Sequence, residues 1–393
     1  MSARRYIYLD NAAATVPSAE VMLAMQQHQV SYFANPGSIH EPARLAKQRL
    51  EQCREGVAKL LNCNSSEVIF SSSGSESNNL AIIGCALANQ NRGKHILVSA
   101  IEHPSVLRSA DRLKSAGFDV EQIPVNSKGL IDKKLLGRLL RDDTILVSVM
   151  YANNEIGTIQ PIRSLAKLVK SYNSNIVFHT DVCQAVGALK IDTKQLAVDM
   201  LSLNGSKIYG PRGVGVLYKN NSVALTPLIN GGHQEYGFRA GTENTSAVEG
   251  FWVALKSNET MRQQESNRLI NLRDEFIATI KSSITGTTLN GHPTKRLPNN
   301  INISFADIEG EALLLILDQA GICVSTGSAC SSRDLKPSHV LIATGSSAEL
   351  AHGSIRFSLG RDTTTQDLDY TLGKLIEAVS KLRSITSIGL KVK

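Results

Sequence analysis

The chain has 393 residues, of which 42% are hydrophobic and 20% are charged, with a formal net charge of +7 at pH 7. This length and composition exclude a disordered chain and indicate a globular protein with two domains, or with one large core and a satellite. The 42 Lys and Arg residues are scattered rather than gathered in runs, which argues against direct nucleic-acid binding.

Short apolar runs alternate with segments of helix length through the first 260 residues. A stripe of apolar residues at helical spacing predicts a helix over 42–61 and places Cys53 on its buried face. Later runs rich in β-branched residues predict strands at EVIF (67–70), HILVSA (95–100), TILVSVM (144–150), IVFHTD (176–181) and VDMLSLN (198–204). The alternation predicts an α/β fold with a mostly parallel sheet flanked by helices.

A second region begins near residue 260 with a charged segment that predicts a helix over 259–284. INISFADI (301–308) and ICVST (322–326) then predict strands on either side of a helix. The last strand leads into a Ser- and Gly-rich loop that carries Cys330. Because buried cysteine packs as a small hydrophobe and this one has no apolar neighbours in sequence, we expect its thiol to contact a functional partner.

The six cysteines form no CxxC pair and no zinc-type spacing with histidine, so we expect neither a disulfide framework nor a metal site. Those outside the polar loop are expected to be packed in the structure: Cys53, Cys63, Cys85, Cys183 and Cys323. With no signal-peptide pattern and no apolar run of about 18 residues, we expect a cytoplasmic protein without a membrane partner.

A polar turn, SSSGSESNN, follows the first predicted strand and opens a predicted helix. Backbone N–H groups and hydroxyls at a helix N-terminus can bind an anion, so Gly74 and Ser75 are candidates for a phosphate site. The same pattern is equally typical of a turn with a helix cap.

Asp181 ends one predicted strand, and Lys207 follows the next strand along the chain. In a parallel sheet both side chains lie at the carboxyl edge, where ligands bind in open α/β folds. The two could form a simple ion pair. Together with a phosphate turn they favour pyridoxal 5'-phosphate, which needs a lysine for its Schiff base, an acid for its pyridine nitrogen and an anion site.

Two other polar residues follow predicted strands in the same manner. His103 lies after the strand at 95–100, and Asn154 lies after the strand at 144–150. A histidine at this edge could stack on a ligand or move protons, although a turn histidine is also commonly just solvated. His179 is two residues before Asp181 on the same strand face, and we expect it to orient Asp181.

A colinear series of motifs runs from residue 6 to about 385. The motifs are YLDNAAAT (8–15), ANPGSIH (34–40), SGSESNNLA (73–81), EHPSV (102–106), NNEIGTIQP (153–161), HTDVCQAVG (179–187), KIYGPRGVG (207–215), FRAGTEN (238–244), STGSAC (325–330) and SIRFSLGR (354–361). The series resembles the NifS/IscS-type cysteine desulfurases, of the long-loop group, in the class V aminotransferase family of pyridoxal phosphate enzymes.

The resemblance implies roles at the cofactor ring. Lys207 would bind the cofactor as a Schiff base and move protons at the substrate Cα, and Asp181 would keep the pyridine nitrogen protonated. His103 would stack on the ring, while Gln184 and Asn154 would bond the ring oxygen or the substrate.

Further implied roles concern the phosphate, the substrate and the subunits. Ser75 and Ser206 would bind the phosphate with Thr242 of a second subunit, so a homodimer is implied. Arg356 would bind the carboxylate of L-cysteine through two N–H groups, a task that suits its planar fork.

By the same resemblance, Cys330 would attack the sulfur of bound L-cysteine, which leaves L-alanine and an enzyme persulfide. The persulfide would pass to an acceptor protein for iron–sulfur cluster assembly or tRNA thiolation, such as an iron–sulfur scaffold protein. Small polar residues around Cys330 suit a segment that must carry sulfur outward.

The resemblance also implies an aspartate aminotransferase-like fold with a seven-stranded sheet. Residues 15–260 would form the large cofactor-binding domain, and 1–14 with 261–393 a smaller α+β domain carrying Cys330. One position departs from the family pattern, because Ser206 stands where relatives usually have histidine. We expect weaker cofactor retention, by about one hydrogen bond or roughly 1 kcal/mol.

Two other functions remain open from sequence. The first is a selenocysteine lyase or another pyridoxal enzyme that uses the same cofactor residues. The second is a degenerate, non-catalytic docking partner in sulfur assembly, for which the only sequence support is Ser206.

Overall fold

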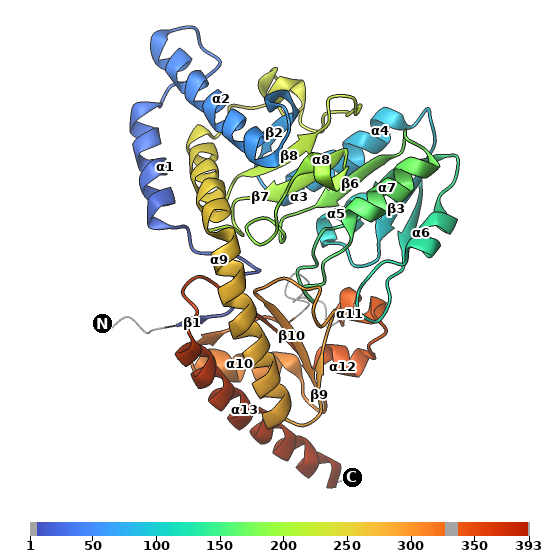
Figure 1. Cartoon of the computed structure of the whole chain (residues 1–393), viewed down its shortest axis with the longest axis vertical. Coiled ribbons are helices and arrows are strands. Elements are labelled where there is room, and N and C mark those ends of the chain that lie inside the picture. Colours follow the sequence, from blue (N-terminus) through green and yellow to red (C-terminus); the bar gives the residue numbers. More distant parts are fainter. Residues whose placement is uncertain (1–5, 327–336, 392–393) are drawn as a thin grey trace.

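The computed structural model describes residues 6–326 and 337–391, and a seven-stranded sheet forms its upper part (Figure 1). In spatial order the strands are β2 (Val68–Ser71), β8 (Gly215–Lys219), β7 (Met200–Asn204), β6 (Val177–Asp181), β5 (Thr144–Ser148), β3 (His95–Ser99) and β4 (Asp119–Ile123). β8 pairs antiparallel with both neighbours, and the pairs from β7 to β4 are parallel. The predicted α/β class and mostly parallel sheet are confirmed.

Successive strand residues point to opposite faces of this sheet, and both faces are buried because helices cover them. On β3, Ile96 and Val98 join one apolar cluster, and Leu97 between them joins the other. One cluster is covered by η2 (Leu80–Gly84), which follows α3 (Gly74–Asn79), and by α4 (Cys85–Asn89) and α5 (Pro104–Ser115). The other is covered by α2 (Glu41–Leu61), α7 (Ile162–Tyr172) and the first half of α9 (Thr245–Ser283).

A second, antiparallel sheet lies below the first one in Figure 1. Its order is β12 (Ser354–Ser358), β10 (Asn300–Phe305) and β9 (Thr287–Leu289). A third apolar cluster packs this sheet against α10 (Gly310–Gln319), α13 (Thr365–Lys391) and the second half of α9. Near the amino end, β1 (Ile7–Tyr8) pairs in parallel with β11 (Ile322–Cys323), which ties the first residues to the strand before the polar loop.

Helix α9 is a single element of 39 residues that runs through both regions. The Asn244 side chain caps it by accepting from the Ala247 N–H at 3.1 Å. Phe251 lies in a cluster of the large sheet, whereas Phe276 lies in the cluster of the small sheet. The predicted division at residue 260 therefore falls inside a continuous helix, and the division itself stays a prediction.

The remaining elements cover edges and connections. They are α1 (Ala19–Ser31), η1 (Ser65–Glu67), α6 (Lys133–Leu139), α8 (Thr193–Leu196), η3 (Gln234–Gly237), α11 (His339–Ala343) and α12 (Ala348–His352). Helix α1 packs along α9. Over the two described ranges, none of the helices combines the length and the apolar character that crossing a membrane requires.

Candidate active site

Asp181 lies at the carboxyl end of β6 and is only 5% exposed. Its Oδ2 accepts from Asn78 Nδ2 at 2.7 Å, and its Oδ1 accepts from the Cys183 N–H at 2.8 Å. Asn78 comes from α3, so the carboxylate is oriented from both its own loop and a neighbouring helix. A buried carboxylate held by two donors is a strong partner for a protonated group.

Lys207 follows β7, the parallel neighbour of β6, and its Nζ donates to the Ala13 carbonyl. The charges of Asp181 and Lys207 both shift the pKa of the His103 imidazole. Burial lowers the pKa of His103, Asp181 partly offsets this, and Lys207 and His339 lower it further. The acid, the lysine and the histidine that the sequence indicated are therefore close enough to influence one another at one sheet edge.

His103 precedes helix α5 and caps it, because its Nδ1 accepts from the Ser105 N–H at 3.1 Å. The other contact of this nitrogen is the Ser105 hydroxyl at 2.8 Å. The bonded nitrogen fixes the plane of the ring, and the residue is half-buried beside Asp181. The ring therefore has a set orientation at the strand end.

Gly74 begins helix α3 next to Asp181. A Cβ atom at this position would lie 2.6 Å from Cys183 Sγ, so only glycine lets the helix start approach the Asp181 loop. Ser73 caps the helix by accepting from the Glu76 N–H at 3.1 Å, and Ser75 is exposed. The helical backbone continues through η2 and α4, so the start of this longer helix offers N–H groups beside the acid.

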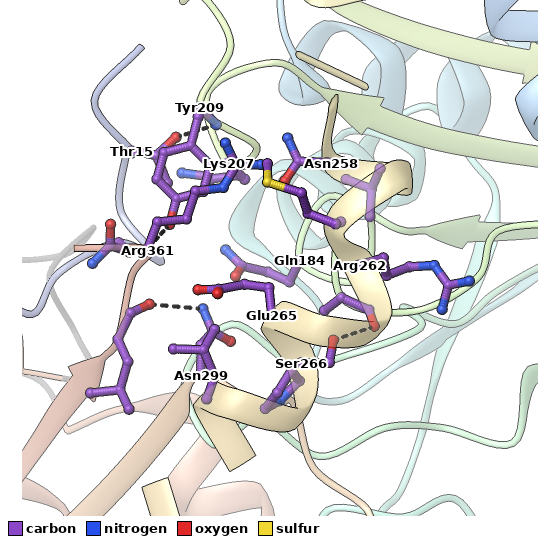
Figure 2. A pocket seen from close by; sticks show the side chains of 18 residues that line it. Thr15, Gln184, Lys207, Tyr209, Asn258, Arg262, Glu265, Ser266, Asn299 and Arg361 are labelled. Carbon is purple, nitrogen blue, oxygen red and sulfur yellow. Dashed lines mark hydrogen bonds between the residues drawn. The ribbon is translucent and has the colours of Figure 1, made fainter. Parts of the chain in front are cut away.

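A pocket opens beside Lys207 along one side of α9 (Figure 2). Lys207 and Gln184 both line it, whereas Asp181 and His103 are not among its lining residues. Gln184 Nε2 donates to the Ala12 carbonyl at 2.9 Å.

Arg356 lies on β12 of the small sheet and reaches the large one. One terminal nitrogen donates to the Asn154 carbonyl at 3.0 Å, and the other donates to Asp10 Oδ1 at 2.8 Å. Its Nε is buried and has no hydrogen-bond partner within the described part of the chain. The guanidinium is thus placed by two segments and keeps an N–H for a further acceptor, such as a carboxylate.

One expected residue, Thr242, is not gathered with the others. Thr242 is exposed and lines a different hollow with Ser71 and Ser72. Ser206 accepts from the Thr15 N–H at 2.9 Å through its carbonyl. Cys330 lies outside the described residues. The phosphate and nucleophile roles of these residues stay predictions.

His179 differs from its expectation. Its Nδ1 contacts the Ser148 hydroxyl and its Nε2 contacts the Ser202 hydroxyl, each at 2.9 Å, on the two strands that flank β6. Burial lowers the pKa of His179 to about 4, so the ring is neutral. The hydrogen bonds that orient Asp181 come instead from Asn78 and from the Cys183 backbone, which the sequence reasoning did not identify.

Among residues 6–326 and 337–391, no group of three His, Cys, Asp or Glu side chains could hold a metal ion. The described cysteines are free thiols. Cys53, on the buried face of α2, donates to Glu249 Oε2 at 3.4 Å, and burial raises the pKa of its thiol to about 12. Its predicted structural placement is confirmed.

Comparison with known proteins gives a consistent result. The family model described as Aminotransferase class-V matches residues 7–371. The cysteine desulfurase IscS of Dictyoglomus turgidum is 48% identical over 383 residues, covering 98% of this chain and 97% of that protein. A solved NifS-like protein has a TM-score of 0.91 at 34% identity and covers 96% of this chain and 100% of its own. SspA in complex with cysteine has a TM-score of 0.79 at 35% identity, covering 90% and 98%.

Proposed function

Because the chain belongs to the class V aminotransferase family, we propose that it is a cysteine desulfurase that uses pyridoxal 5'-phosphate. The similarity to a cysteine desulfurase IscS over nearly the whole chain supports this activity, as does the similarity to a protein solved with cysteine. The observation that carries the proposal is the shared sheet edge of Asp181, Lys207 and His103, where acid and lysine charges both act on one imidazole.

The residues at this edge suit the cofactor. Asp181 is a buried, oriented acid for a protonated ring nitrogen, and Lys207 is an amine on the neighbouring strand end. Gly74 and Ser75 supply backbone N–H groups and a hydroxyl for a phosphate at the start of the helix. When bound, the cofactor withdraws electrons from the bonds of the substrate Cα.

We propose the remaining roles from the resemblance to the family. His103 would stack on the cofactor ring, and Gln184 and Asn154 would bond the ring oxygen or the substrate. Lys207 holds the cofactor and moves the proton at the substrate Cα. Ser206 bonds the phosphate with a shorter side chain than the histidine usual in the family, which weakens retention by roughly 1 kcal/mol.

Arg356 binds the carboxylate of L-cysteine, for which its unpartnered Nε is suited. The thiolate of Cys330 then attacks the substrate sulfur and forms a sulfur–sulfur bond. The carbon–sulfur bond breaks, its electron pair remains on the carbon, and protonation of that carbon gives L-alanine. The transferred sulfur stays on Cys330 as a persulfide.

A homodimer is the proposed working form. Apolar side chains of α1 and of the segment after it are open to solvent in the single chain: Met22, Leu23, Val30, Phe33 and Ile39. Such a patch is typical of a protein interface. Thr242 is also exposed, as a residue that binds the phosphate of a second subunit should be.

We also propose the finer assignments of domains, partner and place. Residues 15–260 bind the cofactor, and residues 1–14 with 261–393 carry Cys330. The persulfide sulfur passes in the cytoplasm to an acceptor protein such as an iron–sulfur scaffold, with iron–sulfur cluster assembly or tRNA thiolation as its use.

Intact-mass analysis after incubation with L-cysteine tests the activity and the nucleophile together. We expect each subunit to gain about one sulfur atom and to release L-alanine, because the persulfide remains on the enzyme thiol. Cys330→Ser should abolish both signals, whereas the half-buried Cys63→Ser should keep both. Full alanine release by Cys330→Ser would refute the mechanism, and a wild type that cannot bind the cofactor would favour a docking role.

A further inference from the structure

Two glutamates of the large-sheet loops contact the start of α11, where the chain continues after the residues that carry Cys330. The Ser338 hydroxyl donates to Glu155 Oε2, and both residues are buried, with 4% and 5% exposed. His339 Nε2 lies 3.0 Å from the Glu102 carbonyl. Glu155 adjoins Asn154 and Glu102 adjoins His103, so this contact region joins α11 to the proposed active site.

The backbone of Glu155 is fixed on both sides. Its N–H donates to Asn153 Oδ1 at 2.8 Å, and its carbonyl accepts from Asn300 Nδ2 at 3.1 Å and Asn302 Nδ2 at 3.2 Å. The asparagines at 300 and 302 belong to β10 of the small sheet. Because the peptide groups on either side are held, the carboxylate has a set direction, and Ser338 is placed by it.

The same glutamate is coupled to the proposed substrate clamp. Burial raises the pKa of Glu155 to about 7, and the Ser338 hydroxyl and the charge of Arg356 act to lower it. The Arg356 backbone in turn pairs with Ser325, with N–H to carbonyl distances of 2.7 and 3.2 Å. The chain is therefore fixed to Arg356 just before residues 327–336 and fixed to Glu155 just after them.

A purely structural role would not need an acid here. A glutamine at position 155 could accept from Ser338 without burying an ionisable group, and a buried carboxylate costs free energy unless it interacts with a charge. The charge that faces Glu155 is Arg356, itself paired with Asp10. The acid thus links the substrate clamp to the start of α11.

We propose that Glu155 is a positioning residue for sulfur transfer, which acts through Ser338 to set where the chain re-enters the fold after the segment that carries the nucleophile. Cys330 precedes Ser338 by eight residues in the sequence. The inference rests on the proposed function, in which Cys330 must meet the sulfur of a substrate held by Arg356. A shift in this anchor misplaces the thiol without removing any group that touches the substrate.

Kinetics of Glu155→Gln test the role. We expect kcat for alanine formation to fall about 10- to 100-fold, since small misplacements of reacting groups cost rates of this size. The affinity for L-cysteine, read from the absorbance change of the bound cofactor, should stay within about twofold, because the clamp remains. A merely structural role would instead lower the folded, cofactor-loaded fraction and leave kcat per loaded subunit unchanged.

A double-mutant cycle with Ser338→Ala asks whether the two residues act through each other. We expect Glu155→Gln/Ser338→Ala to be no slower than the slower single variant, within about twofold. Ser338 also caps α11, where its Oγ accepts from the Leu341 N–H at 3.3 Å. Ser347→Ala is the matched control, because Ser347 caps the next helix, α12, in the same manner at 3.2 Å and keeps the Glu155 contact intact.

The pH profile of kcat supplies a further readout. Wild-type kcat should fall as pH drops through about 7, where Glu155 takes up a proton, and Glu155→Gln should lack this step. The charged or titratable groups around Glu155 are Arg356 with Asp10, Arg296 on the adjacent Ile156 carbonyl, and Glu102 with His339. All of them remain in the variant, so they contribute equally to both profiles.

Wild-type kcat in Glu155→Gln at every pH would overturn the inference, as would multiplicative rate losses in the cycle. Should Glu155→Gln fail to fold, Ser338→Ala measured against Ser347→Ala decides the matter, and equal kcat values overturn it. A wild type that forms no persulfide from L-cysteine is a different result, since it refutes the proposed function and the inference with it.

Discussion

The large and small sheets contribute to the site in different ways. At the edge of the large sheet, Asp181 accepts from two donors and both nitrogens of His179 contact serine hydroxyls. On the small sheet, Arg356 binds Asp10 and the Asn154 carbonyl but keeps a buried Nε without a partner in the described chain. The acid proposed for the cofactor is thus already oriented, and the residue proposed for the substrate carboxylate keeps an unused N–H group.

The largest expected effect concerns the lysine proposed for the cofactor. Lys207→Ala should lower L-alanine formation by at least about 10²- to 10⁴-fold, the usual contribution of a positioned proton-transfer group. It should also prevent the cofactor from being fixed to the protein by borohydride, which intact mass detects. Activity within tenfold of the wild type would refute this role for the lysine.

A second effect should appear in stability rather than in activity. The pKa of His179 is lowered from 6.5 to about 4, so the unfolded chain takes up a proton near pH 6.5 and the folded chain does not. The free energy of unfolding should therefore fall as pH drops from 6.5 to 4, by on the order of 3 kcal/mol at most. Urea unfolding of apoprotein across this range measures it.

His179→Gln should flatten that pH dependence, because the titrating group is gone, while lowering the stability at pH 7 through the lost serine contacts. His40→Gln is the control, since His40 is exposed. If both variants keep the wild-type slope, the buried imidazole is not the group responsible.

A third, smaller effect concerns the substrate end. Arg356→Lys replaces a planar fork by a point charge, so KM for L-cysteine should rise by about tenfold with a lesser change in kcat. Steady-state kinetics beside the exposed Arg138→Lys variant check it. An unchanged KM would mean that Arg356 does not bind the substrate and serves only its contacts with Asp10 and Asn154.

The smallest effect concerns the phosphate contact that we propose for Ser206. Ser206→His should bind pyridoxal phosphate more tightly by roughly 1 kcal/mol, or about fivefold, because the longer side chain adds a donor to the phosphate. Spectral titration of apoprotein with the cofactor gives the dissociation constant. A wild type that binds as tightly as the variant would contradict the expectation.

Sequence reasoning was most effective for the large sheet. The apolar runs at 176–181 and 198–204 form the neighbouring parallel strands β6 and β7. They could be recognised because strands that are buried on both faces carry continuous apolar runs. Strands β8 and β12 were not predicted, although β8 completes the sheet and β12 carries Arg356. β8 has only three consecutive apolar residues, Val216 to Tyr218, and polar residues alternate with apolar ones in β12, so neither forms a long apolar run.

The residues of the site could be predicted from the sequence more readily than the contacts between them. Arg356 and Asp10 are 346 positions apart, and Ser338 and Glu155 are 183 apart, so no local spacing relates them. Asn78 lies in the motif that predicts a phosphate-binding turn, one helical turn after Gly74. Its side chain donates a hydrogen bond to Asp181. Such pairs arise from the packing of segments that are distant in sequence, which a single sequence does not reveal.

Helix α9 sets a mechanical limit on how the two ends of the site can move. Thirty-nine helical residues extend over roughly 58 Å, and their peptide hydrogen bonds continue where a hinge between the two regions would be sought. Rotation of one region against the other must bend this helix, because no flexible linker lies between the regions along α9. Helices without a kink curve only gently. The distance between Asp181 and Arg356 should therefore change little, and in the proposed function any large movement of sulfur falls to shorter segments of the chain.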